Sequence, residues 1–354
     1  MEINNRLIGY DAQILVTGST GFIGKRVVAS LLEHGFTKIR CLVRPSAKSV
    51  RMHTLLETQS DETRVKIFEG NLLSREDCVR ISKDAQIIYH LAAGRGEKSY
   101  PNAYLNSVAT TRNLLDACLR HGCLKRFVNV SSFTVYTNRD KPKGNVLDEA
   151  CPVEQHPALR GSPYCFAKVK QEEMIMEYAG KHGLPYVIVR PGVVYGSGNE
   201  QIHGRVGIST FGIFLHLGGS NKVPLTYVDN CADAIVLAGI VKGIDGEVFN
   251  IVDDDLPSSR HFLSLYKRQV NRFPSIYVPR LLSYALCYLW EKYSDWSQGQ
   301  LPNAFNRKDW HATWKKTIYT NEKLKQRLGW RQRVPTNEGL NKYFESCQGK
   351  KRHA

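Results

Sequence analysis

The stretch LVTGSTGFIG, residues 15–24, places Gly18, Gly21 and Gly24 at intervals of three behind a run of β-strand formers. Where a strand turns into a helix, the first N–H groups of the helix carry partial positive charge and attract an anion. The first glycine permits the turn, the second lets a pyrophosphate contact the backbone, and the third lets the helix pack close to the sheet. The stretch therefore predicts a dinucleotide-binding turn, although its G-x-x-G-x-x-G spacing departs from the common G-x-G-x-x-G form.

The nearest alternative is a Walker-type phosphate loop, because Lys25 directly follows Gly24. That motif needs a glycine where this chain has Ser19, and Ser or Thr where it has Arg26. We therefore reject the Walker loop. A glycine trio with a purely structural role is the remaining alternative.

Short β-branched, apolar runs alternate along the chain with helical patterns such as residues 24–35 and 109–122. The runs occupy residues 13–17, 39–43, 65–70, 86–93, 126–132 and 185–191, and a later run at 246–252 could return to the same sheet. Strands of this kind, separated by helices, indicate a parallel sheet covered on both faces. We predict an α/β fold, a Rossmann-type doubly wound parallel sheet with a smaller C-terminal substrate-binding lobe.

The regular alternation fades after Pro191, and this sets the expected domain boundaries. We assign residues 11–192 to the Rossmann dinucleotide-binding core, with 226–252 returning to it. Residues 193–225 and 253–345 are assigned to the substrate-binding lobe, and 346–354 to a basic tail.

The 354 residues carry a formal net charge of +16, and 42% of them are hydrophobic, which is ordinary globular composition. The basic residues are dispersed and no nucleic-acid-binding signature occurs, so we expect a solvated surface and no nucleic-acid partner. The nine cysteines lack paired metal-type spacing, which predicts reduced thiols, no metal site and a cytoplasmic protein. The opening residues also lack the apolar stretch of a signal peptide.

The second predicted strand ends in CLVRPSAKS, where an acidic residue would bind the adenosine ribose of NAD. This chain has Arg44 there, with Lys48 close by and no acidic residue between them. An arginine at this point accommodates a 2′-phosphate, so the sequence favours NADP over NAD. The alternative is a surface arginine without a ligand.

A predicted helix begins after the Ser162 cap with Pro163 at its first position, and it carries Tyr164 and Lys168 on one face. A phenol needs help to exchange protons near neutral pH, and a neighbouring ammonium supplies it by stabilising the phenolate. Ser131 and Ser132 end the fifth predicted strand, at the sheet edge where ligands bind. The alternatives are a chance Y-x-x-x-K spacing and serines that merely end a strand.

Together, TGSTGFIG, Ser132, Tyr164-x-x-x-Lys168 and PLTYVDNCADA (224–234) resemble the extended short-chain dehydrogenase/reductase, or NAD-dependent epimerase/dehydratase, superfamily over about residues 11–345. The resemblance implies a bound NADP or NAD, with Tyr164 as general acid/base, Lys168 holding the nicotinamide ribose and Ser132 orienting the substrate. The expected cofactor-binding residues are Gly18, Thr20, Gly21, Phe22, Ile23, Gly24, Arg44, Asn71, Leu72, Leu91, Ala92, Ala93, Asn106, Ser131, Tyr164, Lys168, Pro191 and Val193. Asn71 replaces the usual aspartate of a G-D-L motif, although its amide oxygen can still accept a hydrogen bond.

The stretches at 190–199, 222–238, 246–265 and 277–293 are similar to the 3β-hydroxysteroid and sterol dehydrogenase branch of that superfamily. Nucleotide-sugar enzymes usually carry an arginine just before the T-Y-V-D equivalent, where this chain reads Val223, Pro224 and Leu225. Arg205, Lys222 or Arg260 could substitute for that arginine. An alcohol/ketone dehydrogenase with an apolar substrate is therefore favoured, and a nucleotide-sugar epimerase, dehydratase or reductase is the alternative. A catalytically silent regulator is the third hypothesis, but such proteins tend to lose the tyrosine or lysine that this chain keeps.

Residues 277–296 predict a helix whose apolar face comprises Leu281, Leu282, Ala285, Tyr288 and Leu289. Arg280, Glu291 and Lys292 are expected to confine it to about three turns, too short to cross a bilayer. Either this face packs on the core or lines the substrate pocket, or it rests peripherally on an anionic membrane. A homodimer, common in the superfamily, is also left open, and His90 is interpreted as a hydrogen-bonded core histidine.

Overall fold

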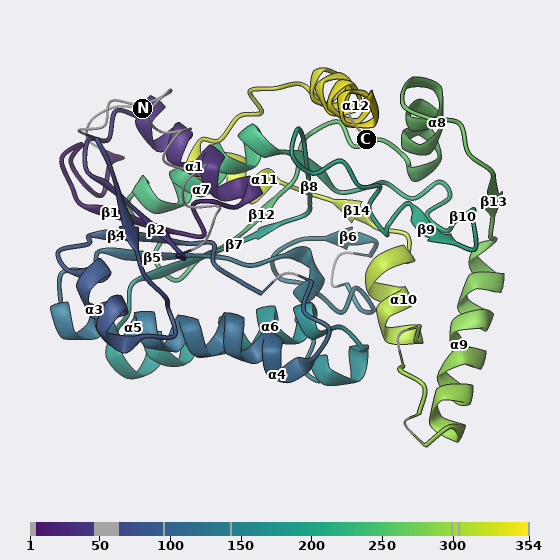
Figure 1. The fold of residues 1–354 in the computed structure, drawn as a ribbon, viewed down its shortest axis with the longest axis horizontal. Helices are drawn as coiled ribbons and strands as arrows, with labels where there is room; N and C mark the ends of the chain where they lie inside the picture. Colours follow the sequence, from purple (N-terminus) through teal and green to yellow (C-terminus); the bar gives the residue numbers. More distant parts are fainter. Residues whose placement is uncertain are drawn as a thin grey trace.

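A seven-stranded parallel sheet forms the centre of the computed structural model, which describes residues 5–45, 64–94, 96–141, 144–298, 300–303 and 305–352 (Figure 1). The strand order is β12–β7–β5–β4–β1–β2–β3, and every neighbouring pair runs parallel. The strands are β1 (Ile14–Thr17), β2 (Ile39–Val43), β3 (Val65–Glu69), β4 (Ile87–His90), β5 (Arg126–Val130), β7 (Tyr186–Pro191) and β12 (Val248–Ile251). These are the seven runs expected from the sequence, so the predicted Rossmann-type α/β fold is confirmed.

Helices cover both faces of this sheet (Figure 1). The helices α1 (Phe22–Glu33), α7 (Val228–Ile240) and α11 (Glu322–Leu328) lie on one face, and α3 (Arg75–Ser82), α5 (Thr110–His121) and α6 (Pro163–His182) on the other. Ile14 and Val16 of β1 point into the first layer, whereas Leu15 points into the second. Because both faces are buried, the central strands need apolar residues at successive positions, which explains their unbroken apolar runs.

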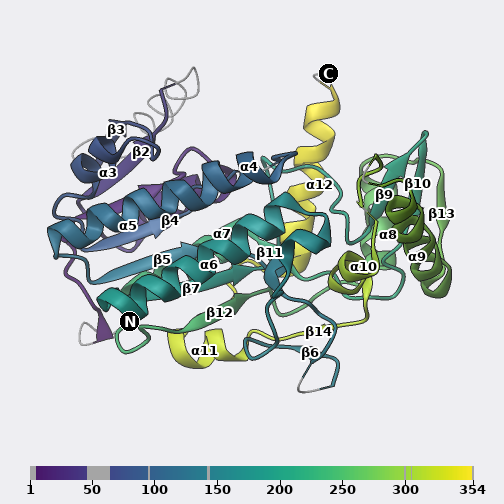
Figure 2. The same cartoon turned by 90° about the horizontal axis from the view of Figure 1, so that it is seen from below.

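The C-terminal lobe lies beyond one end of the sheet (Figure 2). It contains the strands β9 (Gly207–Thr210), β10 (Ile213–His216) and β13 (Ser275–Tyr277) in one small sheet, and the helices α8 (Ser259–Gln269), α9 (Arg280–Trp296), α10 (Arg307–Trp314) and α12 (Thr336–Arg352). Two short parallel pairs link it to the core, β8 (Val193–Tyr195) with β11 (Leu225–Tyr227) and β6 (Val146–Leu147) with β14 (Ile318–Tyr319). Short turns of helix in the described residues include α4 (Tyr100–Ala103), η2 (Tyr104–Ala109), η3 (Phe133–Val135) and η4 (Pro157–Arg160).

Two segments cross the boundaries expected from the sequence. Leu324 and Leu328 of α11 pack into the core cluster around α1 and α7, although the sequence analysis assigned 253–345 to the lobe. The helix α12 runs to Arg352, so residues 346–352, which were expected to form a basic tail, belong to this helix. The segment 226–252 supplies α7 and β12, both of which belong to the core layers.

The helix α9 differs from its expectation in two respects. It is 17 residues long, because Glu291 and Lys292 continue it instead of ending it. Its expected apolar face is exposed, with Leu281 showing 86% and Leu289 61% of its surface, so the interpretation of that face as core or pocket lining is wrong. Among the described residues, no helix combines the length and apolar character required to span a bilayer.

Gly239 of α7 lies against Tyr89 of β4, and this contact generates a stability prediction. A Cβ atom at position 239 would stand 2.1 Å from the Tyr89 hydroxyl oxygen, which donates to the carbonyl of Val236 at 2.9 Å. Because Tyr89 is fully buried, Gly239→Ala must push it aside, and we expect a loss of about 1–3 kcal/mol in the free energy of unfolding. Urea unfolding followed by circular dichroism measures this loss.

The matched control is Gly180→Ala in α6, where an added Cβ would have no neighbour within 4 Å. That variant should gain about 0.5–1 kcal/mol, because alanine restricts the unfolded chain more than glycine does. Equal effects of the two substitutions would contradict the tight approach of α7 to β4.

Candidate active site

A cavity of about 680 Å³ opens at the carboxyl ends of the central strands. All residues that the sequence analysis named as catalytic or cofactor-binding line it: Gly18, Thr20, Gly21, Phe22, Ile23, Gly24, Arg44, Asn71, Leu72, Leu91, Ala92, Ala93, Asn106, Ser131, Ser132, Tyr164, Lys168, Pro191 and Val193. They end or follow the strands β1, β2, β3, β4, β5 and β7, begin the strand β8, or lie on the helices α1, η2 and α6. A volume of this size suits a ligand as large as a dinucleotide with a small substrate.

The glycine turn between β1 and α1 has no room for a side chain at Gly18 or Gly24. Gly18 has a φ of 69°, which an L-residue with a side chain rarely adopts. A Cβ on Gly24 would stand 2.1 Å from the carbonyl oxygen of Gly18. Gly21 is the N-cap of α1 and has no side chain that could accept a hydrogen bond. Within the described residues, no capping side chain therefore bonds the N–H groups of the first turn, which remain available to a ligand in the cavity. The turn therefore fits the pyrophosphate of a dinucleotide.

The end of β2 supplies a positive charge to the cavity. Arg44 is exposed and lies one residue beyond the strand, whereas Lys48 lies outside the described residues. After the next strand, the Asn71 side-chain oxygen already accepts from the N–H of Leu73 at 3.0 Å, and the N–H of Asn71 donates to Asp77 at 2.8 Å. Asn71 thus shapes the turn after β3 at the rim of the cavity.

Lys168 carries a buried charge at the inner wall of the cavity. It lies one turn after Tyr164 on α6, is 3% exposed, and its Nζ donates to the carbonyl oxygen of Val130 at 2.8 Å. Burial lowers the pKa of Lys168 to about 8, while the negative charge of Glu172 acts in the opposite direction. The ammonium is therefore protonated at pH 7 and held at a defined place beside the end of β5.

The end of β5 places hydroxyl groups next to this ammonium. Ser132 is the N-cap of η3, and its Oγ accepts from the N–H of Thr134 at 3.2 Å. The Oγ of Ser131 is buried and has no hydrogen-bond partner among the described residues. A buried hydroxyl without a partner is costly, and a polar ligand in the cavity would satisfy it.

His90 lies beneath the cavity in a hydrogen-bonded environment. Its two ring nitrogens contact the hydroxyls of Thr17 at 2.8 Å and Thr111 at 2.9 Å. Burial, with a contribution from the positive charge of Lys168, lowers the pKa of His90 to about 3, so the ring is neutral. The interpretation as a core histidine is confirmed.

Further residues line the cavity that the sequence analysis did not name: Leu42, Gly94, Glu97, Thr110, Val130, Gly192, Val194, Asn199 and His203. Glu97 accepts from the side-chain amide of Asn106 at 2.8 Å and so orients that residue. Asn106 itself lies in η2, a stretch of π-helix, a widened geometry that occurs often at functional sites. Gly192 could have been predicted from the sequence as a cavity residue, because it directly follows the proline that ends a predicted strand. Glu97 and His203 could not, because they lie in loops whose path the sequence does not reveal.

This chain is similar in sequence to known enzymes and to a family of them. The model of the NAD dependent epimerase/dehydratase family matches residues 14–251. The 3beta-hydroxysteroid-dehydrogenase/decarboxylase isoform 1 of Arabidopsis thaliana is 25% identical over 94% of this chain and 79% of its own length. A trifunctional UDP-glucose 4,6-dehydratase/UDP-4-keto-6-deoxy-D-glucose 3,5-epimerase/UDP-4-keto-L-rhamnose-reductase of the same organism is 27% identical over 67% of this chain and 36% of its own length.

Among solved structures, the UDP-glucuronic acid 4-epimerase of Bacillus cereus, in complex with UDP-glucuronic acid and NAD, has the same fold. It aligns with a TM-score of 0.70 and 21% identity, over 96% of this chain and 99% of the other.

The buried ammonium of Lys168 generates a pH-dependent prediction. Below pH 8 the folded protein holds this charge out of water, so Lys168→Met should raise the free energy of unfolding of the cofactor-free protein by about 1–3 kcal/mol. Between pH 8 and 10.5 the folded wild type loses the proton while the unfolded chain keeps it, so wild-type stability rises with pH in that window. The difference between the two proteins should therefore shrink from pH 8 to 10.5. Urea unfolding at several pH values measures it.

The control is Lys170→Met, which removes a partly exposed lysine from the same helix. Its stability difference from wild type should stay small and nearly constant over the same pH range. If the stability difference between Lys168→Met and the wild type also stayed constant over this pH range, burial would not lower the pKa of Lys168.

Proposed function

This chain belongs to the NAD dependent epimerase/dehydratase family, and from that premise we propose that it is an NAD(P)-dependent oxidoreductase. The proposed reaction is hydride transfer between the nicotinamide and a secondary alcohol or ketone, on a 3β-hydroxysteroid-like, sterol-like or other apolar substrate. The observation that carries the proposal is that Ser132, Tyr164 and Lys168 line one cavity with the glycine turn. Retention of both Tyr164 and Lys168 argues against a catalytically silent regulator.

Each of the three side chains has a distinct proposed role. When bound, the nicotinamide supplies the group that accepts or donates the hydride. Tyr164 moves the proton between its phenol oxygen and the substrate oxygen, as a general acid or base according to the direction of the reaction. Lys168, fixed by its hydrogen bond to Val130, stabilises the phenolate by its charge and holds the ribose. Ser132 donates to the substrate oxygen and orients it.

The surroundings of three cations favour an apolar substrate over a nucleotide sugar. Arg205 donates to the carbonyl of Thr313 and to the Tyr319 hydroxyl, and Lys222 donates to the carbonyl of Leu256. Arg260 lies over the ring of Tyr277, at 5.6 Å from its centroid. These three residues were the candidates for gripping a sugar-nucleotide diphosphate, and the residues that line the 680 Å³ cavity do not include them.

A nucleotide-sugar epimerase, dehydratase or reductase is the second candidate. It draws support from the similarity to the trifunctional Arabidopsis enzyme and from the fold shared with the UDP-glucuronic acid 4-epimerase. Turnover of a UDP-sugar panel, with no turnover of 3β-hydroxysteroids or other secondary alcohols, would establish this second candidate.

We further propose that the enzyme acts in the cytoplasm and contacts an anionic membrane peripherally. Most large hydrophobic side chains that are exposed in the described part of the chain belong to two segments, 211–213 and 276–305. Phe211 is 100% exposed at the tip of the β9–β10 hairpin, and Trp296 at the end of α9 is 76% exposed. Figures 1 and 2 both show this hairpin and α9 at the same end of the molecule. Exposed basic residues, including Arg280 and Lys292, accompany the apolar surface and would complement anionic lipids.

Tyr164→Phe tests the proposed chemistry. Loss of the general acid/base should lower turnover by about 10²- to 10⁴-fold while cofactor affinity stays nearly unchanged. The assay follows NADPH formation at 340 nm with a panel of 3β-hydroxysteroids. The control is Tyr178→Phe, which loses a hydroxyl bonded to Asp116 farther along α6 and should keep its turnover. Near-normal turnover by Tyr164→Phe would exclude the assignment.

Arg44→Ala tests the preference for NADP. A charge-assisted contact with the 2′-phosphate is worth about 1.5–3 kcal/mol, so calorimetry should show NADP binding about 10- to 150-fold more tightly than NAD. The substitution should remove most of that difference, whereas Arg75→Ala, an exposed arginine outside the cavity, should preserve it. Equal affinities of the wild-type protein for both cofactors would make Arg44 an ordinary surface residue.

Vesicle flotation tests the membrane contact. The wild-type protein should float with phosphatidylserine-containing vesicles at low salt and less at high salt, because salt screens the attraction. Replacing both Leu281 and Leu289 with aspartate should abolish flotation, whereas Met176→Asp, an exposed site on α6, should not. If the wild type stays in the soluble fraction, the membrane contact is refuted. A concentration-dependent dimer lost in the same double variant would then identify a second copy of the chain as the partner.

A further inference from the structure

Arg160 is a buried charge at the entrance to the helix that carries Tyr164. It is the last residue of η4 and is 3% exposed. After it, Gly161 turns the chain with a φ of 71°, and Ser162 caps α6 by accepting from the N–H of Cys165 at 3.2 Å. Three residues thus separate Arg160 from Tyr164 along the chain.

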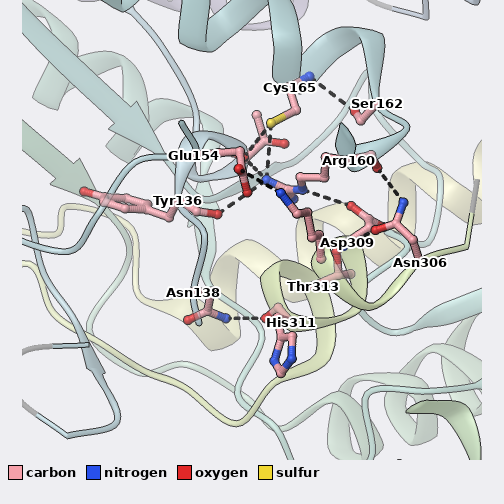
Figure 3. A network of polar contacts seen from close by, with 12 residues as sticks. Tyr136, Asn138, Glu154, Arg160, Ser162, Cys165, Asn306, Asp309, His311 and Thr313 are labelled. Atoms are coloured by element: carbon pink, nitrogen blue, oxygen red, sulfur yellow. Dashed lines mark hydrogen bonds and ion pairs between the residues drawn. The ribbon is translucent and has the colours of Figure 1, made fainter. Parts of the chain in front are cut away.

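The guanidinium joins the turn before α6 to the turn after β5 (Figure 3). Its Nη1 donates to the carbonyl oxygen of Thr134, to that of Tyr136 at 3.4 Å and to the sulfur of Cys165 at 3.3 Å. Thr134 and Tyr136 follow Ser132, and Cys165 follows Tyr164. One side chain therefore connects the backbone next to Ser132 with the residue next to Tyr164.

The same side chain also reaches the C-terminal lobe. Its Nε donates to the Asp309 carboxylate of α10 at 3.2 Å. Asn306, the N-cap of α10, donates its side-chain amide to the carbonyl oxygen of Arg160 at 3.1 Å. The backbone of Asn303 approaches so closely that a Cβ on Gly161 would stand 2.2 Å from its carbonyl oxygen. The start of α10 is therefore bonded to Arg160 at two points, and the segment before α10 lies close against Gly161.

Arginine has the chemistry to set distances at such a junction. Its N–H groups point in fixed directions from a rigid plane, so partners bonded to one guanidinium are held at defined separations. A buried guanidinium also needs a counter-charge, and Asp309 supplies it. Loss of Asp309 would remove the carboxylate bonded to this guanidinium and free the side chain to seek solvent, which would loosen the carbonyls of Thr134 and Tyr136 from the start of α6.

We propose that Arg160 is a positioning residue that fixes the distance between Ser132 and Tyr164, and that Asp309 makes this distance depend on attachment of the C-terminal lobe. The inference rests on the proposed roles of Ser132 and Tyr164. On this proposal, the C-terminal lobe, which is expected to bind the substrate, also controls the distance between Ser132 and Tyr164, the two residues proposed to act on the substrate oxygen.

The test compares Asp309→Ala with Glu291→Ala. Each removes one carboxylate that pairs with an arginine, but Asp309 pairs with Arg160 of η4, whereas Glu291 of α9 bonds Arg307 of α10 at 2.9 and 3.1 Å within the lobe. Circular dichroism and thermal unfolding first establish that both variants are folded. Arg160 itself is left intact, because its removal would leave buried carbonyl oxygens without donors.

Two measurements need no substrate. The first is the NMR resonance of the Tyr164 ring carbon Cζ in protein labelled with [¹³Cζ]tyrosine, identified by its disappearance in Tyr164→Phe. The second is the rate at which iodoacetamide alkylates the buried Cys165, read by peptide mass spectrometry. Asp309→Ala should shift the resonance and speed alkylation roughly tenfold, the effect of losing one charged hydrogen bond from the closed turn. Glu291→Ala should match the wild type in both.

Kinetics with a 3β-hydroxysteroid and NADP⁺ provide the third measurement. Misplacement of Ser132 against Tyr164 should lower kcat by about 10²-fold in Asp309→Ala, with KM and cofactor affinity nearly unchanged. A wild-type Tyr164 resonance together with a wild-type Cys165 rate in Asp309→Ala would overturn the inference. Failure of the wild-type enzyme to turn over any steroid would count against the proposed substrate class, while the two substrate-free measurements still decide the role of Arg160.

Discussion

The contact between the backbones of Gly18 and Gly24 is the constraint on which the site depends. Because a Cβ at position 24 would overlap the carbonyl of Gly18, α1 begins closer to the sheet edge than any other residue would allow. This closeness aims the N–H groups of its first turn at the cavity. It also lets α1 pack on α7 and so joins residues 228–240 to the first strand's layer. One steric requirement thus serves the fold and also leaves these N–H groups open to an anion.

Several buried charged side chains surround the helix α6. Lys168, Arg160 and the bidentate Arg190–Glu172 pair are all nearly inaccessible to solvent and lie on or beside α6. Each costs desolvation energy that only specific partners offset. Their concentration around one helix is costly for stability but holds that helix in one orientation, as pre-organised chemistry requires. Within the described part of the chain, Lys168 makes one hydrogen bond, to the carbonyl of Val130, and it is the residue that we propose holds the cofactor.

In the C-terminal lobe, one helix is bonded to the core and a neighbouring helix has an exposed apolar face. Its α10 is tied to the core through Asp309 and Asn306, whereas the outer face of the adjacent α9 exposes leucine, tyrosine and tryptophan side chains. Trp310 and Trp314 of α10 pack with Cys287 of α9 in a small cluster that unites the two helices. The helix α9 thus packs on α10, and α10 in turn bonds the turn that precedes Tyr164.

The sequence by itself determined the fold, because buried parallel strands require apolar runs and a phosphate turn requires glycine, and both are local demands. It also named the glycine turn, Tyr164 and Lys168, whose spacing of four lies on a single helix and needs no knowledge of the fold. Only the tertiary structure showed that Arg160 meets Asp309, that Glu97 bonds Asn106, and that His203 lines the cavity. It also decided that Leu281 and Leu289 face outward, since an apolar helical stripe looks the same in sequence whether it is covered or exposed. Contacts between residues 149 positions apart leave no local pattern, because only the folded chain brings them together.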